Sequence, residues 1–330
     1  MPSTAAHDAP RSTVLPTLLD PPETNPDLRT TGRSRLSETG DAPEIAFRHS
    51  GWHALRDRVY SALLAVGVPT SRLDRFRCCG ANAWVLRSRT NPEQYKIASD
   101  RCHDRFCIPC ANLRSRTIAA NVRFSLSGKP ARFVTLTLAD DDDAPEATIR
   151  KLVSCFSRLR ARKLWKRTQE GGCCFVEIKR SSNADRWNVH LHIITEGRYM
   201  PQNELSKAWK AITGTSYIVD IRAVKNAEHA AKYVTKYASK PMDPSVTRNP
   251  NHLAAAVRAL TGRRLCTTFG TWRGMTLTAE PTDDVWEAVA PLAEVIERAA
   301  RGDVFSIAML TILRGEKPCE GNQRTLSGFI

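Results

Sequence analysis

What the sequence lacks narrows its interpretation first. No apolar stretch in its 330 residues approaches the roughly 20 that a membrane-spanning helix needs. The segment after Met1 is polar and contains proline, so it does not form a signal-peptide core. We therefore expect a cytoplasmic protein that contacts no membrane. The sequence also has no internal repeat and no G-x-x-x-x-G-K-S/T phosphate loop, which excludes a motor of the P-loop class.

Acidic residues are in deficit. The chain has 34 Asp and Glu against 49 Lys and Arg, a formal net charge of +15. Such an excess is expected of a protein that approaches the phosphate backbone of nucleic acid, although charge alone names no function. In a reducing compartment, the 10 cysteines indicate metal ligands or buried thiols rather than disulfides.

Composition divides the chain into four segments. Residues 1–45 are rich in Pro, Ser, Thr, Asp and Gly and have few large apolar side chains, so they predict a disordered tail. Residues 46–128 predict a helical, cysteine-bearing module, with a helix over 52–66 where apolar residues recur at helical spacing. Residues 129–245 form a separate unit, and residues 246–330 predict a mostly helical extension whose sequence indicates no function.

The unit 129–245 alternates strand and helix patterns. Short β-branched and aromatic runs predict strands, and apolar spacings of three and four predict helices. The expected strands are 133–138, 173–180, 187–195 and 217–224, and the expected helices are 147–165, 204–212 and 226–239, the last one capped by Asn226. This order suits an α+β architecture in which a central antiparallel sheet is flanked by helices.

Two histidines stand on one face of a predicted strand. Along residues 187–194 the apolar side chains point to one side, and His190 and His192 point to the other, about 7 Å apart at the backbone. A hairpin register then places Glu177 across from His190. Two imidazoles and a carboxylate suit an octahedral Mg²⁺ or Mn²⁺ ion. A slip of one residue would turn Glu177 away, and an isolated histidine pair is also compatible with hydrogen bonding on a solvated face.

Two tyrosines and three lysines share a predicted helix. Tyr233 and Tyr237 are four residues apart, so both lie on one face, about 6 Å apart along the axis. Lys232, Lys236 and Lys240 form an adjacent stripe suited to DNA phosphates. An amphipathic helix with its tyrosines packed on a sheet and its lysines in water has the same pattern, so the helix alone leaves both interpretations open.

Half of the cysteines cluster before the predicted sheet. Cys102, Cys107 and Cys110 form C-x4-C-x2-C with a proline in the last gap, and Cys78 and Cys79 lie upstream. Four thiolates in two groups match a closed, tetrahedral structural Zn²⁺ site. We favour Cys79 as the fourth ligand, because the glycine after it eases the tight turn of a metal knuckle, and Cys78 is the alternative. Buried free thiols are the other explanation.

Together these motifs resemble the HUH endonuclease superfamily. Its three signatures are a T-L-T strand, here within 133–138, a metal-binding H-u-H strand, here 190–192, and a catalytic-tyrosine helix, here 233–237 in the form Y-x-x-K-Y. The two tyrosines are similar to the branch that includes gene A proteins of small single-stranded DNA phages, plasmid rolling-circle initiators and related transposases. The resemblance covers roughly residues 130–240 with the motifs in the family's order, and it implies the HUH endonuclease fold.

The resemblance also implies catalytic roles. His190 and His192 would hold the catalytic Mg²⁺ or Mn²⁺, and Tyr233 and Tyr237 would be the nucleophiles. Lys236 would contact DNA near the scissile phosphate.

Other residues would support these groups. Thr135 and Thr137 would do so from the adjoining strand. The family varies at the third metal ligand, for which Glu177 is the candidate and Glu228 and His229 are substitutes.

The implied function is rolling-circle initiation. The protein would nick single-stranded or supercoiled origin DNA, leaving a 5′-phosphotyrosine link and a free 3′-hydroxyl for a host DNA polymerase. A host helicase is implied, since the chain has no phosphate loop of its own. The alternatives are a two-tyrosine transposase and a non-catalytic, zinc-stabilised DNA-binding regulator. The segment 269–274 combines glycines, an aromatic and an arginine, which indicates either stacking on single-stranded DNA or a simple turn.

Overall fold

The computed structural model describes residues 42–126, 128–139, 144–181, 186–238, 243–264, 266–279 and 285–315, without the side chains of 235–238. Of the predicted tail, residues 1–41 lie outside this description. The last residues of that segment belong to helix α1, Pro43–Arg48, in which Ile45 is buried. A proline at the first helical position and a buried apolar side chain explain the helix at this point.

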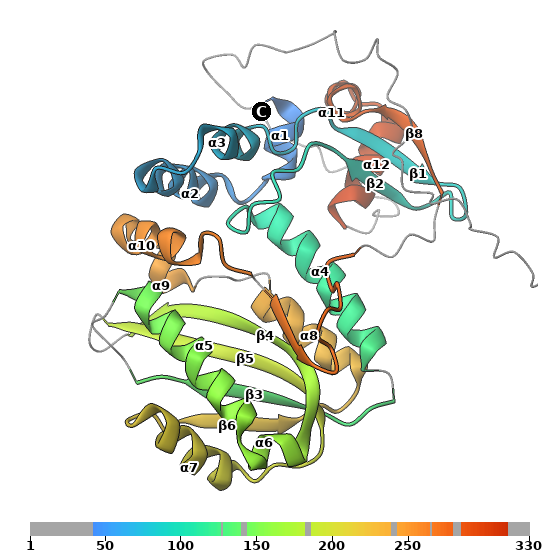
Figure 1. Ribbon diagram of the computed structural model, residues 1–330. Helices are drawn as coiled ribbons and strands as arrows, with labels where there is room; N and C mark the ends of the chain where they lie inside the picture. Colours follow the sequence, from blue (N-terminus) through green and yellow to red (C-terminus); the bar gives the residue numbers. More distant parts are fainter. Residues whose placement is uncertain are drawn as a thin grey trace, which may run out of the picture. The chain divides into compact units, whose positions relative to one another are not determined.

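A five-stranded sheet carries the predicted histidines (Figure 1). Its strands lie in the order β6-β3-β5-β4-β7, and every neighbouring pair is antiparallel. The strands are β3 (Ala131–Thr137), β4 (Gln169–Arg180), β5 (Trp187–Gly197), β6 (Val219–Ala223) and β7 (Cys266–Gly270). The predicted α+β architecture with an antiparallel sheet flanked by helices is therefore confirmed.

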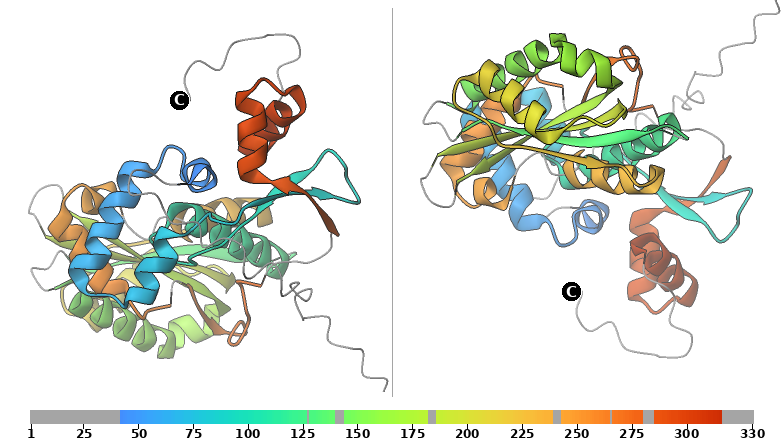
Figure 2. Two further views of the ribbon diagram at one scale, coloured as in Figure 1. Left: turned by 90° about the horizontal axis from the view of Figure 1, so that it is seen from above. Right: turned by 90° about the horizontal axis from the view of Figure 1, so that it is seen from below.

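Helices cover both faces of this sheet (Figure 2). One face carries α5 (Pro145–Ala161), α6 (Lys163–Thr168) and α7 (Gln202–Thr213), and the other carries α4 (Ile108–Ser125) and α8 (Ala227–Ala238). The single helix predicted over 147–165 is divided into α5 and α6. Arg162 interrupts it with an extended backbone, φ −70° and ψ 149°, and serves as a cap of both helices.

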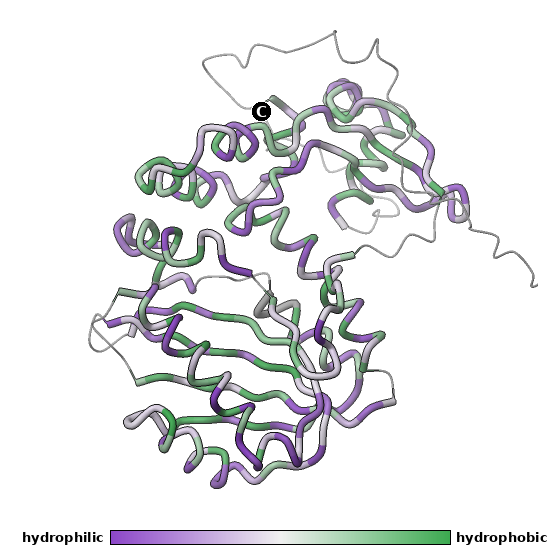
Figure 3. Tube along the Cα trace, in the orientation of Figure 1, coloured by the Kyte–Doolittle hydropathy of each residue, from purple (hydrophilic) through white to green (hydrophobic). Residues whose placement is uncertain are grey.

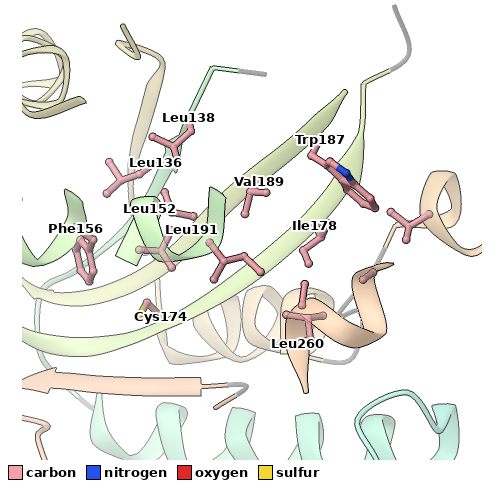
Figure 4. Packing of buried hydrophobic residues seen from close by; sticks show 14 of the residues in the cluster. Leu136, Leu138, Leu152, Phe156, Cys174, Ile178, Trp187, Val189, Leu191 and Leu260 are labelled. Atoms are coloured by element: carbon pink, nitrogen blue, oxygen red, sulfur yellow. The ribbon is translucent and has the colours of Figure 1, made fainter. Parts of the chain in front are cut away.

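The face beneath α5 is apolar, because side chains alternate between the two faces of a strand. Val189 and Leu191 of β5 share a buried cluster with Leu152 and Phe156 of α5, and Figure 4 shows these side chains between helix and sheet. In Figure 3 the central strands are mainly hydrophobic, whereas hydrophilic segments alternate along the helices. Burial of this apolar surface, at about 25 cal/mol per Å², holds α5 on the sheet.

The opposite face is shared between packing residues and the histidines. Ile118 of α4, Phe175 of β4 and Val234 of α8 are buried in one cluster. At the start of α8, the Asn226 side chain accepts a hydrogen bond from the His229 backbone N–H at 2.8 Å, as the predicted N-cap requires. The cluster and the cap together fix α8 against the strands.

A second, three-stranded sheet joins the cysteine-bearing module to the C-terminal segment. Its order is β2-β1-β8, built from β1 (Trp84–Ser88), β2 (Tyr95–Ala98) and β8 (Trp286–Pro291). The strands of the C-terminal segment thus enter both sheets, β7 beside β4 and β8 beside β1, across the boundary placed at residue 245.

The remaining helices lie before the first sheet or in the C-terminal segment. They are α2 (His53–Val66), α3 (Thr70–Arg77), α9 (Pro244–Thr247), α10 (Pro250–Leu260), α11 (Leu292–Ala300) and α12 (Val304–Arg314). In the part of the chain that the structure describes, no helix is both long and apolar enough to cross a membrane.

The segment 269–274 is a turn that packs into the protein. Trp272 is 2% exposed, and its indole N–H donates to Glu196 Oε2 at 3.0 Å. Gly270 has a φ of +61°, and a Cβ there would lie 2.0 Å from the Glu170 carbonyl oxygen, so only glycine fits. The alternative in which Trp272 stacks on single-stranded DNA is wrong, because its ring has no exposed face.

We predict that Trp272→Phe lowers the free energy of unfolding by about 2–4 kcal/mol, since it removes a hydrogen bond to a buried carboxylate and leaves a small cavity. Chemical denaturation of the full chain measures this change. Trp52→Phe is the matched control, because Trp52 is 43% exposed and its loss should cost less than about 0.5 kcal/mol. Unchanged stability of Trp272→Phe, with weaker binding to single-stranded DNA, would contradict this assignment.

Candidate functional site

The predicted hairpin register is the observed one. Glu177 of β4 lies directly across from His190 of β5, and the pairing of Arg180 with Trp187 starts that register. On the other side of β5, Thr137 pairs with His190 and Thr135 pairs with His192. Directly opposed residues share a face, so two imidazoles, a carboxylate and two hydroxyls gather on the side of the sheet that α8 covers.

Hydrogen bonds orient both imidazoles. His192 Nε2 lies 2.8 Å from Glu177 Oε2, and His190 Nδ1 lies 3.0 Å from Thr137 Oγ1. The two ring centroids are 6.0 Å apart. Partners of this kind set the tautomer and the orientation of a histidine, which is how metal-binding histidines are usually held.

Glu177 is a buried carboxylate with cationic neighbours. Lys179 Nζ lies 3.1 Å from its Oε2. Burial alone would raise the pKa of Glu177, but the hydrogen bond and charge of His192, together with Lys179, hold that pKa below its ordinary value. The side chain is therefore an anion at neutral pH. Sequence reasoning did not include Lys179, whose signal is its place two residues after Glu177 on the same strand face.

Tyr233 reaches the histidine pair from α8. Its hydroxyl lies 3.1 Å from His192 Nδ1 and 3.4 Å from Thr135 Oγ1. Its ring stacks on Phe133 of β3, with centroids 4.0 Å apart and planes inclined by 19°. Tyr233 thus packs on the sheet and also directs its hydroxyl at the imidazoles. The sequence left open whether the tyrosines pack on the sheet or face a site, and Tyr233 does both.

The other predicted residues of α8 and its surroundings are placed differently. Lys232 is exposed on α8, whereas Lys240 and the side chains of Lys236 and Tyr237 lie outside the described residues.

Glu177 is also distinguished from its two substitutes as third ligand. It is Glu177 that contacts His192, whereas Glu228 pairs with Arg123 at 2.8 Å and His229 packs edge-on against Phe133.

The cysteine motif forms a buried cluster. The sulfur atoms of four cysteines, Cys79, Cys102, Cys107 and Cys110, all lie within 4.8 Å of one another, so the cluster could hold a metal such as zinc. Hydrogen bonds from the neighbouring thiols, that of Cys102 first, lower the pKa of Cys79, whereas hydrogen bonds within the same cluster, that of Cys107 first, raise the pKa of Cys102. Within the described ranges, no second group of three ligand atoms lies as close together. Cys78 is half-buried and outside the cluster, in agreement with the choice of Cys79.

Two residues from the beginning of the described chain also contact the cluster. His49 is buried, with Nε2 3.6 Å from Cys107 Sγ, and Arg48 Nη2 lies 3.5 Å from Cys110 Sγ. Donors and positive charge at these positions would offset the negative charge of the thiolates. Sequence reasoning missed both residues, because their only local signal is the short apolar pattern of α1.

The chain is similar in sequence to known replication proteins. Residues 95–301, which include the sheet, the tyrosine helix and three of the four clustered cysteines, match the family model described as Replication protein. The chain belongs to this family. It is also 22% identical over 213 residues to Protein rep of Staphylococcus aureus, which covers 59% of this chain and 93% of that protein. No solved structure matches the chain significantly. The resemblance to replication initiators is thereby confirmed at the level of the family.

Proposed function

We propose that this replication protein initiates rolling-circle replication by nicking one strand of origin DNA. The observation that carries the proposal is the 3.1 Å contact between the Tyr233 hydroxyl and His192 Nδ1, whose ring also contacts the Glu177 carboxylate. A nucleophile, two imidazoles and a carboxylate on one sheet face support phosphoryl transfer, with the HUH endonuclease fold as the scaffold.

The donor set fits a hard divalent ion, Mg²⁺ or Mn²⁺. Two imidazoles and a carboxylate are donor types that such an ion takes, and His192 and Glu177 already direct theirs at each other, 2.8 Å apart. We propose His190, His192 and Glu177 as its ligands. When bound, the ion would polarise the oxygens of the scissile phosphate.

The protein's own groups prepare Tyr233 for attack. If an ion took the place of the Nε2 contact to Glu177, His192 would be neutral with its proton on Nδ1, from which it could donate to the Tyr233 oxygen 3.1 Å away. This hydrogen bond stabilises the phenolate of a group whose ordinary pKa is about 10. His190 Nδ1 donates in the same way to Thr137, which leaves Nε2 as the ligand atom.

The nicking step exchanges one ester for another. The Tyr233 oxygen forms a bond to phosphorus, the bond from phosphorus to the 3′ oxygen breaks, and the tyrosine proton passes to solvent. The departing oxygen takes up a proton, so the products are a 5′-phosphotyrosine and a 3′-hydroxyl. Lys232, which is exposed on α8, and Lys236 and Lys240 would contact phosphates of the same strand.

The second tyrosine would carry out a second cleavage. Tyr237 follows Tyr233 by about one helical turn, so it could attack the regenerated site after one round of synthesis, while the first strand is still linked. A host polymerase would extend the 3′-hydroxyl, and a host helicase would separate the strands. A transposase would use the same chemistry on other DNA, whereas a DNA-binding regulator would not need the contact between Tyr233 and His192.

We also propose that Cys79, Cys102, Cys107 and Cys110 hold a structural Zn²⁺. Four thiolates form a closed tetrahedral site without an open position for substrate. The ion would stabilise the module and would take no part in cleavage.

The first prediction concerns the histidines. His190→Ala and His192→Ala should each reduce formation of the covalent adduct by roughly a hundredfold or more, because the metal site loses a ligand. DNA affinity should stay within about threefold, since basic side chains supply most of it. Adduct formation is measured on a labelled single-stranded oligonucleotide in Mg²⁺ or Mn²⁺. DNA affinity is measured by fluorescence anisotropy. The control is His53→Ala, an exposed position on α2. Full cleavage by either site variant would remove the metal assignment.

The second prediction separates the tyrosines. Phenylalanine keeps the ring that stacks on Phe133 and removes the nucleophile, so Tyr233→Phe should impair initial cleavage more than Tyr237→Phe does. The double variant should form no adduct, and both single variants should be impaired in strand transfer.

Its control is Tyr60→Phe, on α2. Cleavage and strand transfer that depend on Tyr233 alone would identify a one-tyrosine enzyme, and an intact adduct in the double variant would refute tyrosine chemistry.

The third prediction concerns zinc. The purified chain should contain about one zinc, and Cys107→Ser should lose it and fall in stability by about 3 kcal/mol or more, because metal binding is coupled to folding. Elemental analysis and thermal denaturation measure these changes. Cys155→Ser, at a buried cysteine of α5 outside the cluster, should keep the metal. Zinc-free wild-type protein of unchanged stability would leave the four cysteines as plain thiols.

A further inference from the structure

An open groove of about 700 Å³ lies apart from the histidine pair. Its walls come from α3, from the loop that carries Cys102, from α4 and from the connection between α10 and β7. Asp104 is the single carboxylate among its described lining residues, against six arginines, a formal excess of five positive charges: Arg72, Arg75, Arg105, Arg114, Arg263 and Arg264. So strong an excess of one sign in a concave surface favours an anionic ligand.

Part of this arginine groove is held rigid by the protein. Arg72 donates to Asp104 at 2.7 Å and to Thr261 at 3.1 Å, and Arg105 donates to the Leu260 carbonyl at 2.8 Å. Arg263 donates to the Ala259 carbonyl at 2.8 Å. Guanidinium groups fixed in this way are preorganised, so less side-chain entropy is lost when they bind phosphate.

Two of the six arginines remain for a ligand. Arg75 and Arg264 are exposed, and within the described ranges neither side chain has a hydrogen bond or an ion pair. They lie on different walls, one on α3 and one just before β7. An anion between these walls would therefore meet positive charge on both sides.

The groove borders the same sheet face as the tyrosine site. Cys266 lines the groove and pairs with Phe175 of β4, so the two side chains share a face. Glu177 follows Phe175 by two residues on that face, about 7 Å along the strand. Ile118 of α4 lines the groove and also belongs to the cluster that packs α8. The groove and the tyrosine site therefore both adjoin the buried Phe175 on one face of the sheet.

The lining also indicates which part of a nucleic acid it contacts. None of the described lining residues is a phenylalanine, tyrosine or tryptophan, and His103 is the one ring among them, whereas six are arginines, so phosphate contacts outnumber stacking contacts. Guanidinium groups on two walls suit the phosphates of one strand. A duplex would present its backbone to one wall only.

We propose that the arginine groove binds the phosphate backbone of single-stranded DNA, independently of base sequence, next to the site of cleavage. The inference rests on the proposed function in one respect, namely that the bound strand is the one that is nicked. The groove would hold this strand through its phosphates, while the site on the sheet acts on one of them.

The test compares two double variants of the full chain. Arg75→Ala with Arg264→Ala removes the two exposed groove arginines, and Arg58→Ala with Arg258→Ala removes two exposed arginines of α2 and α10 outside the groove. Anisotropy with a mixed-sequence single-stranded oligonucleotide, without added divalent ions so that nothing is cut, gives the affinity between 50 and 200 mM salt. The salt range is roughly the one over which phosphate contacts change affinity most visibly.

The groove variant should bind roughly twentyfold more weakly at 0.1 M salt, and the slope of log affinity against log salt should be shallower by about 1.4, the loss of two phosphate contacts. The control should stay within about threefold of the wild type. An equal loss of affinity in both variants would contradict the groove proposal, because it would indicate general electrostatic attraction of DNA by a basic protein. A loss confined to duplex DNA would overturn the single-strand assignment.

Adduct formation by the wild type is measured separately. If no adduct forms while the groove variant still loses affinity for the single strand, the nicking function fails and the groove stands. If the adduct forms and the groove variant binds like the control, the groove fails and the nicking function stands.

Discussion

Across the β4–β5 pair Glu177 faces His190, and the face of every side chain on these strands follows from that register. A shift of one residue would turn Glu177 toward α5 and carry Ile178 to the histidine face. Ile178 and Leu191 are buried in the core beneath α5, so the shift would remove apolar contacts from that core and place the Glu177 carboxylate there without His192. The packing that stabilises the sheet therefore selects the register that assembles the site.

Helix α8 completes this site through its packing on the sheet. Val234, next to Tyr233, is buried with Ile118 of α4, and the stacking of Tyr233 on Phe133 sets the height of its ring above β3. The hydroxyl then lies beside His192 because of the rotation of the helix about its axis. In the proposed reaction, a tyrosine held on a packed helix would lose little freedom when the substrate binds, which favours a defined geometry of attack.

Local patterns predict the strands better than they predict their distant partners. The alternation along β5 and the short loop of the hairpin were sufficient to predict that Glu177 faces His190, since both are properties of neighbouring residues. The pairing of β7 with β4 and of β8 with β1 joins segments far apart in the chain, and the periodicity of the sequence does not predict these pairings. The contacts of His49 with the cysteine cluster and of Tyr233 with His192 depend likewise on how helices pack.

The cysteine cluster and the arginine groove share one loop, through which a metal bound by the cysteines would influence the shape of the groove. The Asp104 backbone N–H contacts Cys102 Sγ at 3.4 Å, and the Asp104 carboxylate accepts from the Phe106 N–H and from Arg72. Asp104 is buried, and these partners satisfy its carboxylate oxygens. A metal bound by the cysteines on both sides of this loop would fix Asp104, and Asp104 would fix Arg72 in the groove wall. Through this ion pair, a metal bound by the cysteines would influence the shape of the proposed DNA groove.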